Sequence, residues 1–297
     1  MNARTVWLAS YPKSGNTWVR ALLAALGDGA VDINRTMSAT IASARTPLER
    51  LTGLVSSELL PEEVMRLRPL VDADLNARLP DGRSGLWHRK IHDGLFTGLD
   101  GAPIVSLAAT RAAIYVVRDP RDVAVSYAHH LGVSVADAVE AMGNRAWRMG
   151  GGRHSPSRHF TQHLGTWSEH VEGWLDHELF PVLLVRYEDL QEDTTAQLRR
   201  MQNVVRREAD DATLSAAVRA ARFDELRAQE SKDGFRERPG PDRAFFRRGI
   251  AGAWRSELPE ELAARIEADH HRVMERLGYA PRSDLEPTAC AEAESSS

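Results

Sequence analysis

The feature that most constrains the fold is a predicted strand, a short loop and a helix that follow one another near the start of the chain. Residues 5–10 (TVWLAS) form a short apolar run of β-favouring type, and TWVRALLAAL, which begins at Thr17, has helical spacing. The loop YPKSGN lies between them. Backbone N–H groups and the positive end of the helix dipole point at such a loop, so the stretch predicts an anion site. By itself it also fits a capped helix start that binds nothing.

Strand and helix patterns alternate along the rest of the chain. Further strands are predicted at 85–92, 112–119 and 181–190. Helices are predicted within 45–79 with a restart at Pro61, from Pro120 with Asp119 as N-cap, at 164–175 and from Pro259 to Leu277. This alternation favours an α/β fold with a central parallel sheet flanked by helices. We expect a single domain over 1–282, a mobile loop at 149–160 and a disordered tail at 283–297.

The overall charge excludes some classes of partner. The formal net charge of the 297-residue chain is −4, which gives no general attraction to nucleic acid or anionic lipid, so an anion site must be local. No apolar run approaches about 20 residues, and the N-terminus has no signal-peptide pattern. The single cysteine, Cys290, allows no intrachain disulfide. We expect a cytoplasmic protein without nucleic-acid or membrane partners, and a homodimer is compatible with the sequence.

Lysine is rare in this chain, so its positions are informative. Among 38 Lys and Arg residues the only lysines are Lys13, Lys90 and Lys232. A position that keeps lysine against this bias either needs a compact ammonium on a flexible stem or has kept it by chance. The first loop does not match G-x-x-x-x-G-K-[ST], because its lysine precedes a single glycine. Its architecture is therefore P-loop-like, while its chemistry differs.

Four stretches resemble the motifs of one enzyme family in the order in which that family carries them. YPKSGNTW, VVRDPRDVAVSY, VRYEDL and FRRGIAGAW are similar to motifs of the sulfotransferases that use 3′-phosphoadenosine 5′-phosphosulfate (PAPS). The resemblance runs from Trp7 to about Trp254 and implies the P-loop-NTPase-like sulfotransferase fold. It is weak at 30–84 and 131–162, where family members differ in their acceptors, and we expect these segments to form the acceptor pocket and lid.

The resemblance also implies which residues bind the donor. The first loop would hold the 5′-phosphate end, with Lys13 as the catalytic electrophile that follows charge onto the bridging oxygen of the leaving phosphate. Arg118, Ser126 and the FRRG segment would hold the 3′-phosphate, and aromatic side chains would lie near the adenine. The implied donor-binding residues are Lys13, Ser14, Gly15, Asn16, Thr17, Trp18, Arg118, Ser126, Tyr187, Phe223, Arg247, Arg248 and Gly249.

Some of these residues also fit roles outside donor binding, and the motifs depart from the family pattern in places. Arg118 could instead form an ion pair with Asp119 or Asp122, Phe223 could be a core residue, and 243–248 could be a solvated basic loop. Arg248 stands where the family usually has lysine, and Ala253 stands where an acidic residue is common. Ala221 and Arg222 replace the usual hydroxyl residues, so hydroxyl contacts to the adenine are not expected.

The stretch RKIH supplies candidates for the acceptor side. It places Lys90 and His92 two residues apart at the end of a predicted strand, on one face. This resembles the family's K-x-H, in which the histidine is the general base and the lysine helps to bind the sulfuryl group. The expected reaction is an in-line transfer of the sulfuryl group from PAPS to a hydroxyl of a small-molecule acceptor, with 3′-phosphoadenosine 5′-phosphate (PAP) as product. Arg- and Ala-rich usage suggests a bacterial source and a hydroxylated secondary metabolite as acceptor.

Two other functions fit parts of the sequence. A P-loop kinase of a small molecule would share the fold, although the GK[ST] pattern and an acidic Mg²⁺ motif are missing. A non-catalytic nucleotide-binding protein could use the basic segment 243–248, but K-x-H adds nothing to binding alone. His154, His159 and His163 have no acidic or cysteine partners at metal-ligand spacing, so no metal is expected.

Overall fold

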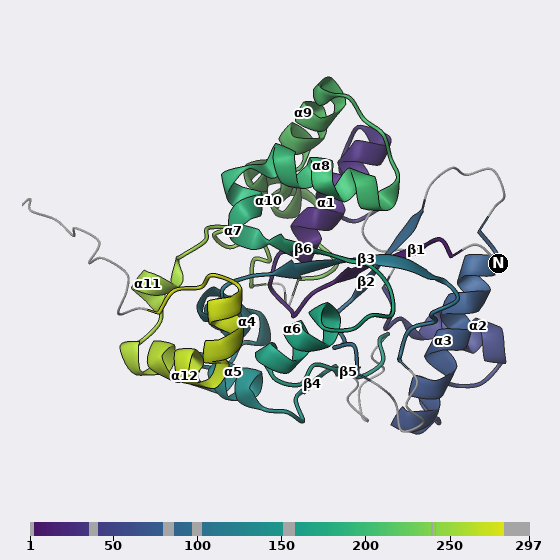
Figure 1. The fold of residues 1–297 in the computed structure, drawn as a ribbon, viewed down its shortest axis with the longest axis horizontal. Coiled ribbons are helices and arrows are strands. Elements are labelled where there is room, and N and C mark those ends of the chain that lie inside the picture. Colours follow the sequence, from purple (N-terminus) through teal and green to yellow (C-terminus); the bar gives the residue numbers. More distant parts are fainter. Residues whose placement is uncertain are drawn as a thin grey trace, which may run out of the picture.

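The protein is built around a four-stranded parallel sheet in the order β2-β1-β3-β6 (Figure 1). The computed structural model describes residues 3–35, 41–79, 86–96, 103–150, 158–238, 240 and 242–281. The sheet strands are β1 (Thr5–Ala9), β2 (Trp87–Ile91), β3 (Thr110–Val117) and β6 (Val182–Arg186). All three strand pairs are parallel, so the carboxyl ends of the strands meet at one edge of the sheet. The predicted α/β fold with a central parallel sheet is confirmed.

Helices cover both faces of the sheet (Figure 1). One face is covered by α1 (Asn16–Asp28), α8 (Thr194–Val205), α9 (Asp211–Ala220) and α10 (Phe223–Asp233). The other is covered by α4 (Pro120–Leu131), α5 (Val135–Gly143), α6 (Trp167–Leu175) and α12 (Glu260–Arg276). At the β2 edge lie α2 (Arg45–Thr52) and α3 (Pro61–Ala77), and the remaining short elements are α7 (Tyr187–Glu192), α11 (Trp254–Glu257), β4 (Arg148–Met149) and β5 (Gln162–His163).

Each central strand contributes side chains to two hydrophobic cores. In β1, Trp7 packs into the core beneath α4, α6 and α12, whereas Val6 and Leu8 pack beneath α1, α8 and α9. In β3, Tyr115 packs into the same core as Trp7, and Ile114 packs into the same core as Val6 and Leu8. Successive strand residues point to opposite faces, so a strand covered on both sides must be apolar throughout. This explains the continuous apolar runs in the sequence.

One predicted strand ends earlier than its sequence suggested. The strand expected at 181–190 stops at Arg186, and the chain continues as helix α7 from Tyr187. Glu188 and Asp189 lie in the first turn of that helix, where the helix dipole favours negative charge. Glu188 also accepts a hydrogen bond from the backbone N–H of Asp119 at 3.0 Å, which fixes the turn against the end of β3. The strand prediction is therefore wrong for 187–190.

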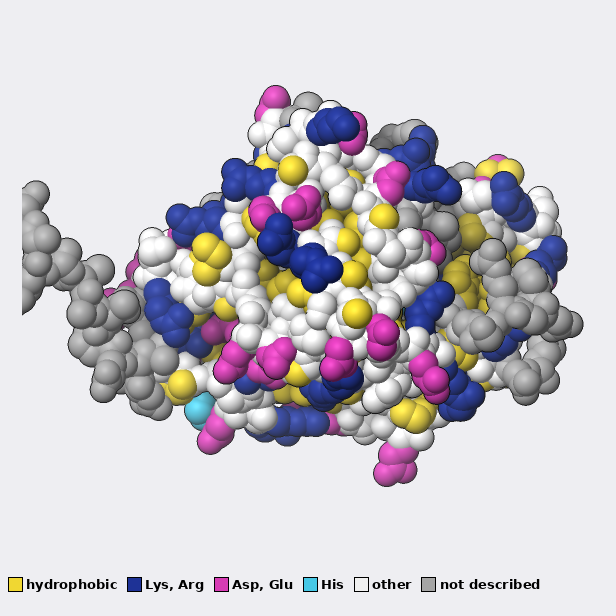
Figure 2. Space-filling model, turned by 90° about the horizontal axis from the view of Figure 1, so that it is seen from above, with side chains coloured by type: hydrophobic (Ala, Val, Ile, Leu, Met, Phe, Trp, Pro, Cys, Tyr) yellow, Lys and Arg dark blue, Asp and Glu magenta, His cyan; other side chains and the backbone are white. Residues whose placement is uncertain are grey.

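Other expectations concern segments at the margins of the fold. The restart at Pro61 is confirmed as the first residue of α3. Residues 151–157 of the predicted mobile loop and the predicted tail at 283–297 lie outside the described residues. In the part of the chain that the structure describes, no helix has the length and apolarity needed to cross a bilayer. Basic and acidic side chains are interspersed on the face seen from above (Figure 2).

Candidate active site

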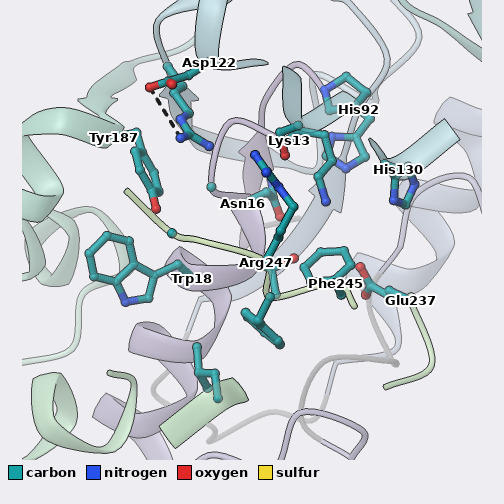
Figure 3. A pocket seen from close by; sticks show the side chains of 18 of the residues that line it. Lys13, Asn16, Trp18, His92, Asp122, His130, Tyr187, Glu237, Phe245 and Arg247 are labelled. Carbon is teal, nitrogen blue, oxygen red and sulfur yellow. Dashed lines mark ion pairs between the residues drawn. The ribbon is translucent and has the colours of Figure 1, made fainter. Parts of the chain in front are cut away.

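A cavity of about 420 Å³ lies at the edge of the sheet where the parallel strands end (Figure 3). Residues that follow each of the four strands line it, including Lys13 after β1, His92 after β2, Arg118 after β3 and Tyr187 after β6. From β1 the chain first adds β2 on one side of the sheet and then β3 on the other side, so a topological switch point lies between β1 and β3. Open α/β sheets bind ligands at such a point. Of the predicted site residues, all except Ser14 line the cavity.

The loop between β1 and α1 forms the floor of the cavity. Its backbone takes the left-handed conformation at Lys13 (φ 70°) and at Gly15 (φ 106°), after which α1 begins at Asn16. A Cβ at position 15 would lie 2.6 Å from a ring carbon of Tyr187, so only glycine fits there. Among the described residues, the backbone N–H groups of Asn16 and Thr17 have no backbone partner. The loop therefore presents free donors at a helix N-terminus.

The side chains of Ser14 and Lys13 in this loop have no hydrogen-bonding protein partner in the described structure. Ser14 is fully buried, and its Oγ makes no hydrogen bond. The Lys13 ammonium pairs with no described carboxylate and lies 3.9 Å from the centre of the Phe245 ring. Burial, and then the neighbouring cation Lys90, lower the pKa of Lys13 to about 7. A partly buried ammonium with only an aromatic face beside it is suited to an anionic ligand.

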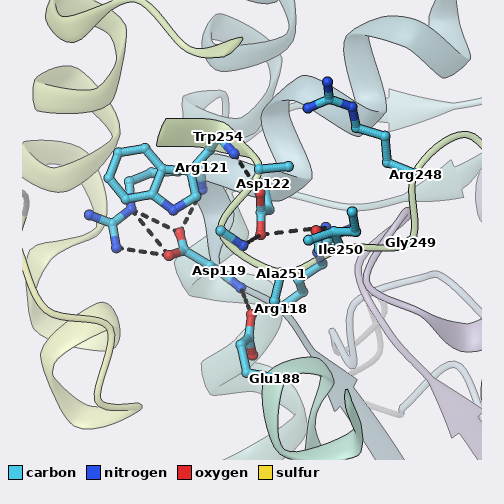
Figure 4. Close-up of polar contacts among 12 residues, drawn as sticks. Arg118, Asp119, Arg121, Asp122, Glu188, Arg248, Gly249, Ile250, Ala251 and Trp254 are labelled. Atoms are coloured by element: carbon cyan, nitrogen blue, oxygen red, sulfur yellow. Dashed lines mark hydrogen bonds and ion pairs between the residues drawn. The ribbon is translucent and has the colours of Figure 1, made fainter. Parts of the chain in front are cut away.

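Arg118 stands at the end of β3 and already has partners. Its Nη2 donates to the Ile250 carbonyl at 2.8 Å and lies 3.4 Å from the Asp122 carboxylate (Figure 4). The guanidinium also stacks 4.4 Å from the centre of the Tyr187 ring, while its Nε is buried with no partner among the described residues. The alternative pairing with Asp122 is therefore present, and the pairing with Asp119 is not, because Asp119 bonds Arg121 instead.

The segment that carries FRRGIAGAW folds over this end of the cavity and is held by carboxylates. The Asp122 carboxylate accepts hydrogen bonds from the backbone N–H groups of Gly252 at 2.7 Å and Trp254 at 2.9 Å (Figure 4). The side chains of Arg247 and Arg248 both pair with Glu257, at 2.6 and 2.7 Å. The segment is thus tied to the scaffold and is not a free solvated loop.

Three aromatic side chains line one end of the cavity. Trp18 packs edge-to-face on Tyr187 with ring centres 5.6 Å apart, and its Nε1 donates to the Ala221 carbonyl at 2.9 Å. Phe223 packs edge-to-face on Phe246 at 5.9 Å. A Cβ at Gly249 would clash with the Phe223 ring. Phe223 therefore belongs to the margin of a hydrophobic core and also lines the cavity.

His92 lies at the opposite end of the cavity (Figure 3). Its Nδ1 is 2.8 Å from the backbone carbonyl of Ser10, which can only accept a hydrogen bond, so Nδ1 carries the proton and Nε2 keeps its lone pair. Burial, and then the positive charge of Lys90, hold the pKa of His92 well below its usual value. The backbone carbonyl of His92 accepts from Nε2 of His170, whose Nδ1 bonds the Tyr115 hydroxyl. The ring is neutral, oriented and buried.

Sequence reasoning missed several residues that line or support this cavity. His130 lines the cavity, and its Nδ1 is buried and unpaired in the described structure. Glu237 pairs with Lys90 at 2.8 Å. Other residues without a sequence signal are Phe245, Glu257, His159, Gln162 and Gln191. They come from separate segments at no fixed spacing, so no motif could have shown them together.

A family model and curated relatives both match this chain to sulfotransferases. The family model described as "Sulfotransferase domain" matches residues 105–278. Sulfotransferase 1A1 of Canis lupus familiaris is 26% identical over 287 residues, which cover 94% of this chain and 86% of that protein. Flavonol 3-sulfotransferase of Flaveria bidentis is 25% identical over 287 residues, covering 92% and 81% of the two chains.

Solved structures share the fold. Retinol dehydratase in a complex with retinol and PAP has a TM-score of 0.60 at 18% identity, over 97% of this chain and 84% of that chain. A mouse sulfotransferase complexed with PAP has a TM-score of 0.59 at 17% identity, over 92% of this chain and 86% of that chain.

Proposed function

The chain belongs to the family of sulfotransferase-domain proteins and is a PAPS-dependent sulfotransferase, and from this premise we propose that it transfers the sulfuryl group to a hydroxyl of a small-molecule acceptor by in-line displacement. The observation that carries the proposal is the meeting of Lys13, Lys90 and the neutral His92 in one cavity. Lys90 and His92 lie in and directly after β2, and Lys13 lies in the loop that follows the adjacent parallel strand β1. Mere nucleotide binding has no use for a buried base at this place.

The residues at the other end of the cavity fit a donor with two phosphate groups. The free N–H groups of the first loop, the Ser14 hydroxyl and Lys13 would bind the 5′-phosphate end. Arg118, Ser126 and the Arg247–Gly249 segment would bind the 3′-phosphate, since guanidinium groups bind phosphate with paired hydrogen bonds. The remaining donor-binding residues in this proposal are Gly15, Asn16, Thr17, Trp18, Tyr187 and Phe223. When bound, PAPS supplies a sulfuryl group that is activated by its bond to the 5′-phosphate.

In this proposal, three residues have separate roles in the sulfuryl transfer. Nε2 of His92 takes the proton of the acceptor hydroxyl as the new O–S bond forms. The bond between sulfur and the bridging oxygen breaks, and the Lys13 ammonium stabilises the charge that grows on that oxygen. Lys90 stabilises the sulfuryl oxygens during transfer. The products are the sulfated acceptor and PAP, and the proton stays on His92 until solvent removes it.

The acceptor is proposed to be a small hydroxylated molecule that enters beside His92. Ser43, His159 and Gln162 line this end, so hydrogen-bonding groups surround the reacting hydroxyl. The solved relative retinol dehydratase holds retinol in one structure and androsterone in another. A bacterial secondary metabolite, sulfated in the cytoplasm by a catalytic unit spanning 1–282, is the specific form of the proposal.

The direct test is incubation of the protein with isotopically labelled PAPS and fractions of candidate metabolites, followed by mass spectrometry. The proposal expects a sulfated product and release of PAP, both abolished by His92→Ala. A parallel incubation with ATP and Mg²⁺ tests the kinase alternative. Binding of ATP together with no thermal shift from PAP would contradict the proposal.

A further inference from the structure

A partly buried carboxylate joins three segments around the catalytic cavity. Glu237 lies in the segment between α10 and α11, and its two oxygens have different partners. Oε1 accepts from Arg20 of α1 at 2.7 Å, and Oε2 accepts from Lys90 of β2 at 2.8 Å. The exposed fractions of the three side chains are 17% for Glu237, 3% for Arg20 and 12% for Lys90. This is a nearly dry ion triad at the edge of the reaction site.

We propose that Glu237 is a positioning residue for sulfuryl transfer, because it holds the Lys90 ammonium at a fixed place beside His92 and fastens the segment that begins at Gly234 to the sheet. The inference rests on the proposed function for the role of Lys90. Nothing in the sequence marks Glu237, and none of the four family-like motifs contains it.

The geometry shows how one ion pair can serve catalysis without disabling the lysine. An ammonium has three N–H donors, and Glu237 uses one of them. The other two are available to sulfuryl oxygens. Without the carboxylate, the four-carbon stem of Lys90 would be free to move through many rotamers. Arg20 fixes the carboxylate from the far side, because it is itself almost fully buried.

The negative charge of Glu237 also helps to keep the two lysines of the cavity protonated. Two lysines line the same cavity, burial lowers the pKa of each, and the charge of Lys90 lowers that of Lys13 further. Glu237 acts in the opposite direction on both, while Lys90 and Arg20 hold the pKa of Glu237 well below its usual range despite burial. Removing this negative charge must therefore lower both lysine pKa values. Lys13, His92, His130 and His159 interact electrostatically with Lys90 and Glu237, and His88 interacts with Arg20. Arg118 and Glu230 act on Lys13, and Arg236 and Arg238 flank Glu237 in the chain.

The small number of lysines makes a direct test practicable. Protein labelled with ¹³C at lysine Cε gives three side-chain signals by NMR, from Lys13, Lys90 and the exposed Lys232 as internal reference. Titration of wild type and Glu237→Gln should show the pKa of Lys90 falling by about one unit or more, because an opposite charge at this distance shifts a pKa by about 1–3 units. A smaller fall is expected for Lys13. Unchanged titration of both lysines overturns the proposal.

Activity gives the second readout, with a matched control. Glu237→Gln should lower kcat at pH 7.5 by up to about tenfold for each unit by which the pKa of Lys13 falls, because that pKa is about 7 in wild type. The loss should shrink at pH 6, where Lys13 regains its proton. Asp72→Asn is the control, because Asp72 also bonds a buried cation on β2, Arg89, but does not line the cavity. It should lower stability without moving the alkaline limb of the kcat profile. Equal pH profiles for the two variants would assign Glu237 a merely structural role and overturn the proposal.

A second variant and a product assay on wild type separate failure of the Glu237 proposal from failure of the proposed function. If Glu237→Gln does not fold, Glu237→Asp keeps the charge and withdraws it by one methylene, so kcat should fall while the Lys90 pKa stays near that of wild type. A lysine titration unaltered by Glu237→Asp together with unaltered kcat contradicts the positioning role. Absence of any sulfated product from wild type refutes the proposed function, whereas the lysine titration still measures the triad itself.

Discussion

The two ends of the cavity use different chemistry. At the donor end, cations stand beside carboxylates: Arg118 beside Asp122, and Arg247 and Arg248 beside Glu257. At the acceptor end, histidines dominate, and burial near Lys13 and Lys90 lowers the pKa values of His92 and His130, the latter to about 4. One end is therefore rich in paired cations, and the other holds histidines with lowered pKa values.

The difference lies in where the cations come from and what they do to their neighbours. The donor-end arginines are compensated by acids on nearby elements, so their field is local. Lys13 lies between the two ends, and its ammonium pairs with no described carboxylate (Figure 3). Burial, and then the charge of Lys90, lowers the pKa of His92, whereas burial and then Lys13 lower the pKa of His130. A neutral ring is the protonation state that a general base needs. Substitutions at each end should therefore have separable effects, which range from a large loss of turnover to a modest change in affinity.

His92→Ala should abolish proton removal while leaving the donor end intact. We expect kcat to fall by about 10²–10⁴, the range typical of general-base removal, with PAP affinity within a factor of about two by calorimetry, because His92 lies outside the proposed donor contacts. His271→Ala, at an exposed histidine of α12, is the control and should leave both quantities unchanged. Near-normal turnover of the His92 variant would contradict the role of the acceptor end in proton removal.

Lys13→Met should impair both ends at once. The ammonium that stabilises the departing oxygen is lost, so kcat should fall by about 10²–10³, as for removal of one preorganised donor to a developing oxyanion. Steady-state sulfation with saturating PAPS measures this loss, and Lys232→Met is the matched control at an exposed lysine. A loss confined to the KM for PAPS would show that Lys13 binds the donor without stabilising the transition state.

Arg118→Gln should affect the donor end alone. Loss of a charged hydrogen-bond donor to phosphate should weaken PAP binding by about 1.5–3 kcal/mol. The kcat at saturating PAPS should change far less than in the His92 variant. Calorimetric titration with PAP, compared with adenosine 5′-phosphate, tests the assignment to the 3′-phosphate: the variant should bind the two ligands with similar affinity. A preference for PAP as strong as that of wild type would contradict it.

PAP affinity should fall as pH rises through about 7. The pKa of Lys13 is lowered to about 7, so the folded protein without ligand loses this positive charge in that range. Binding of an anion then requires uptake of a proton, and affinity should drop by at most about tenfold per pH unit. The Lys13→Met variant supplies the baseline, since titration of the PAP phosphates affects both proteins equally. Parallel pH profiles for the two proteins would show that Lys13 does not sense the ligand.

The loop and strand-end residues that line the proposed donor end could be named from short motifs in the sequence, because local geometry fixes their spacing. A lysine, a left-handed glycine and a helix start must follow one another within a few residues, and Arg118 must follow β3 directly. The fold followed from the same kind of signal, since two covered sheet faces require strands that are apolar throughout. The strand predicted at 181–190 is too long because β-favouring Val185 and Tyr187 extend the pattern of PVLL, whereas tertiary contacts of Glu188 hold the helical turn that follows Arg186.

The residues that hold Lys90 and Lys13 in place could not be predicted, because they are far from these lysines in the sequence and contact them only in the folded chain. Glu237 reaches Lys90 across 147 positions and Arg20 across 217. Phe245 reaches Lys13 in the same way, and neither pairing leaves a spacing that recurs. His92 was found only because K-x-H is itself short. Its proton donation to Ser10, which decides which ring nitrogen acts, depends on the neighbouring strand.

The single carboxylate shared by Arg247 and Arg248 has a consequence for how binding responds to salt. Both guanidinium groups begin with an internal counterion, Glu257, in place of mobile anions from solution. A phosphate that arrives there exchanges partners with that glutamate and releases few dissolved ions. PAP affinity should therefore decline with ionic strength less steeply than the number of cations in the cavity suggests, and Glu257→Gln should make that decline steeper.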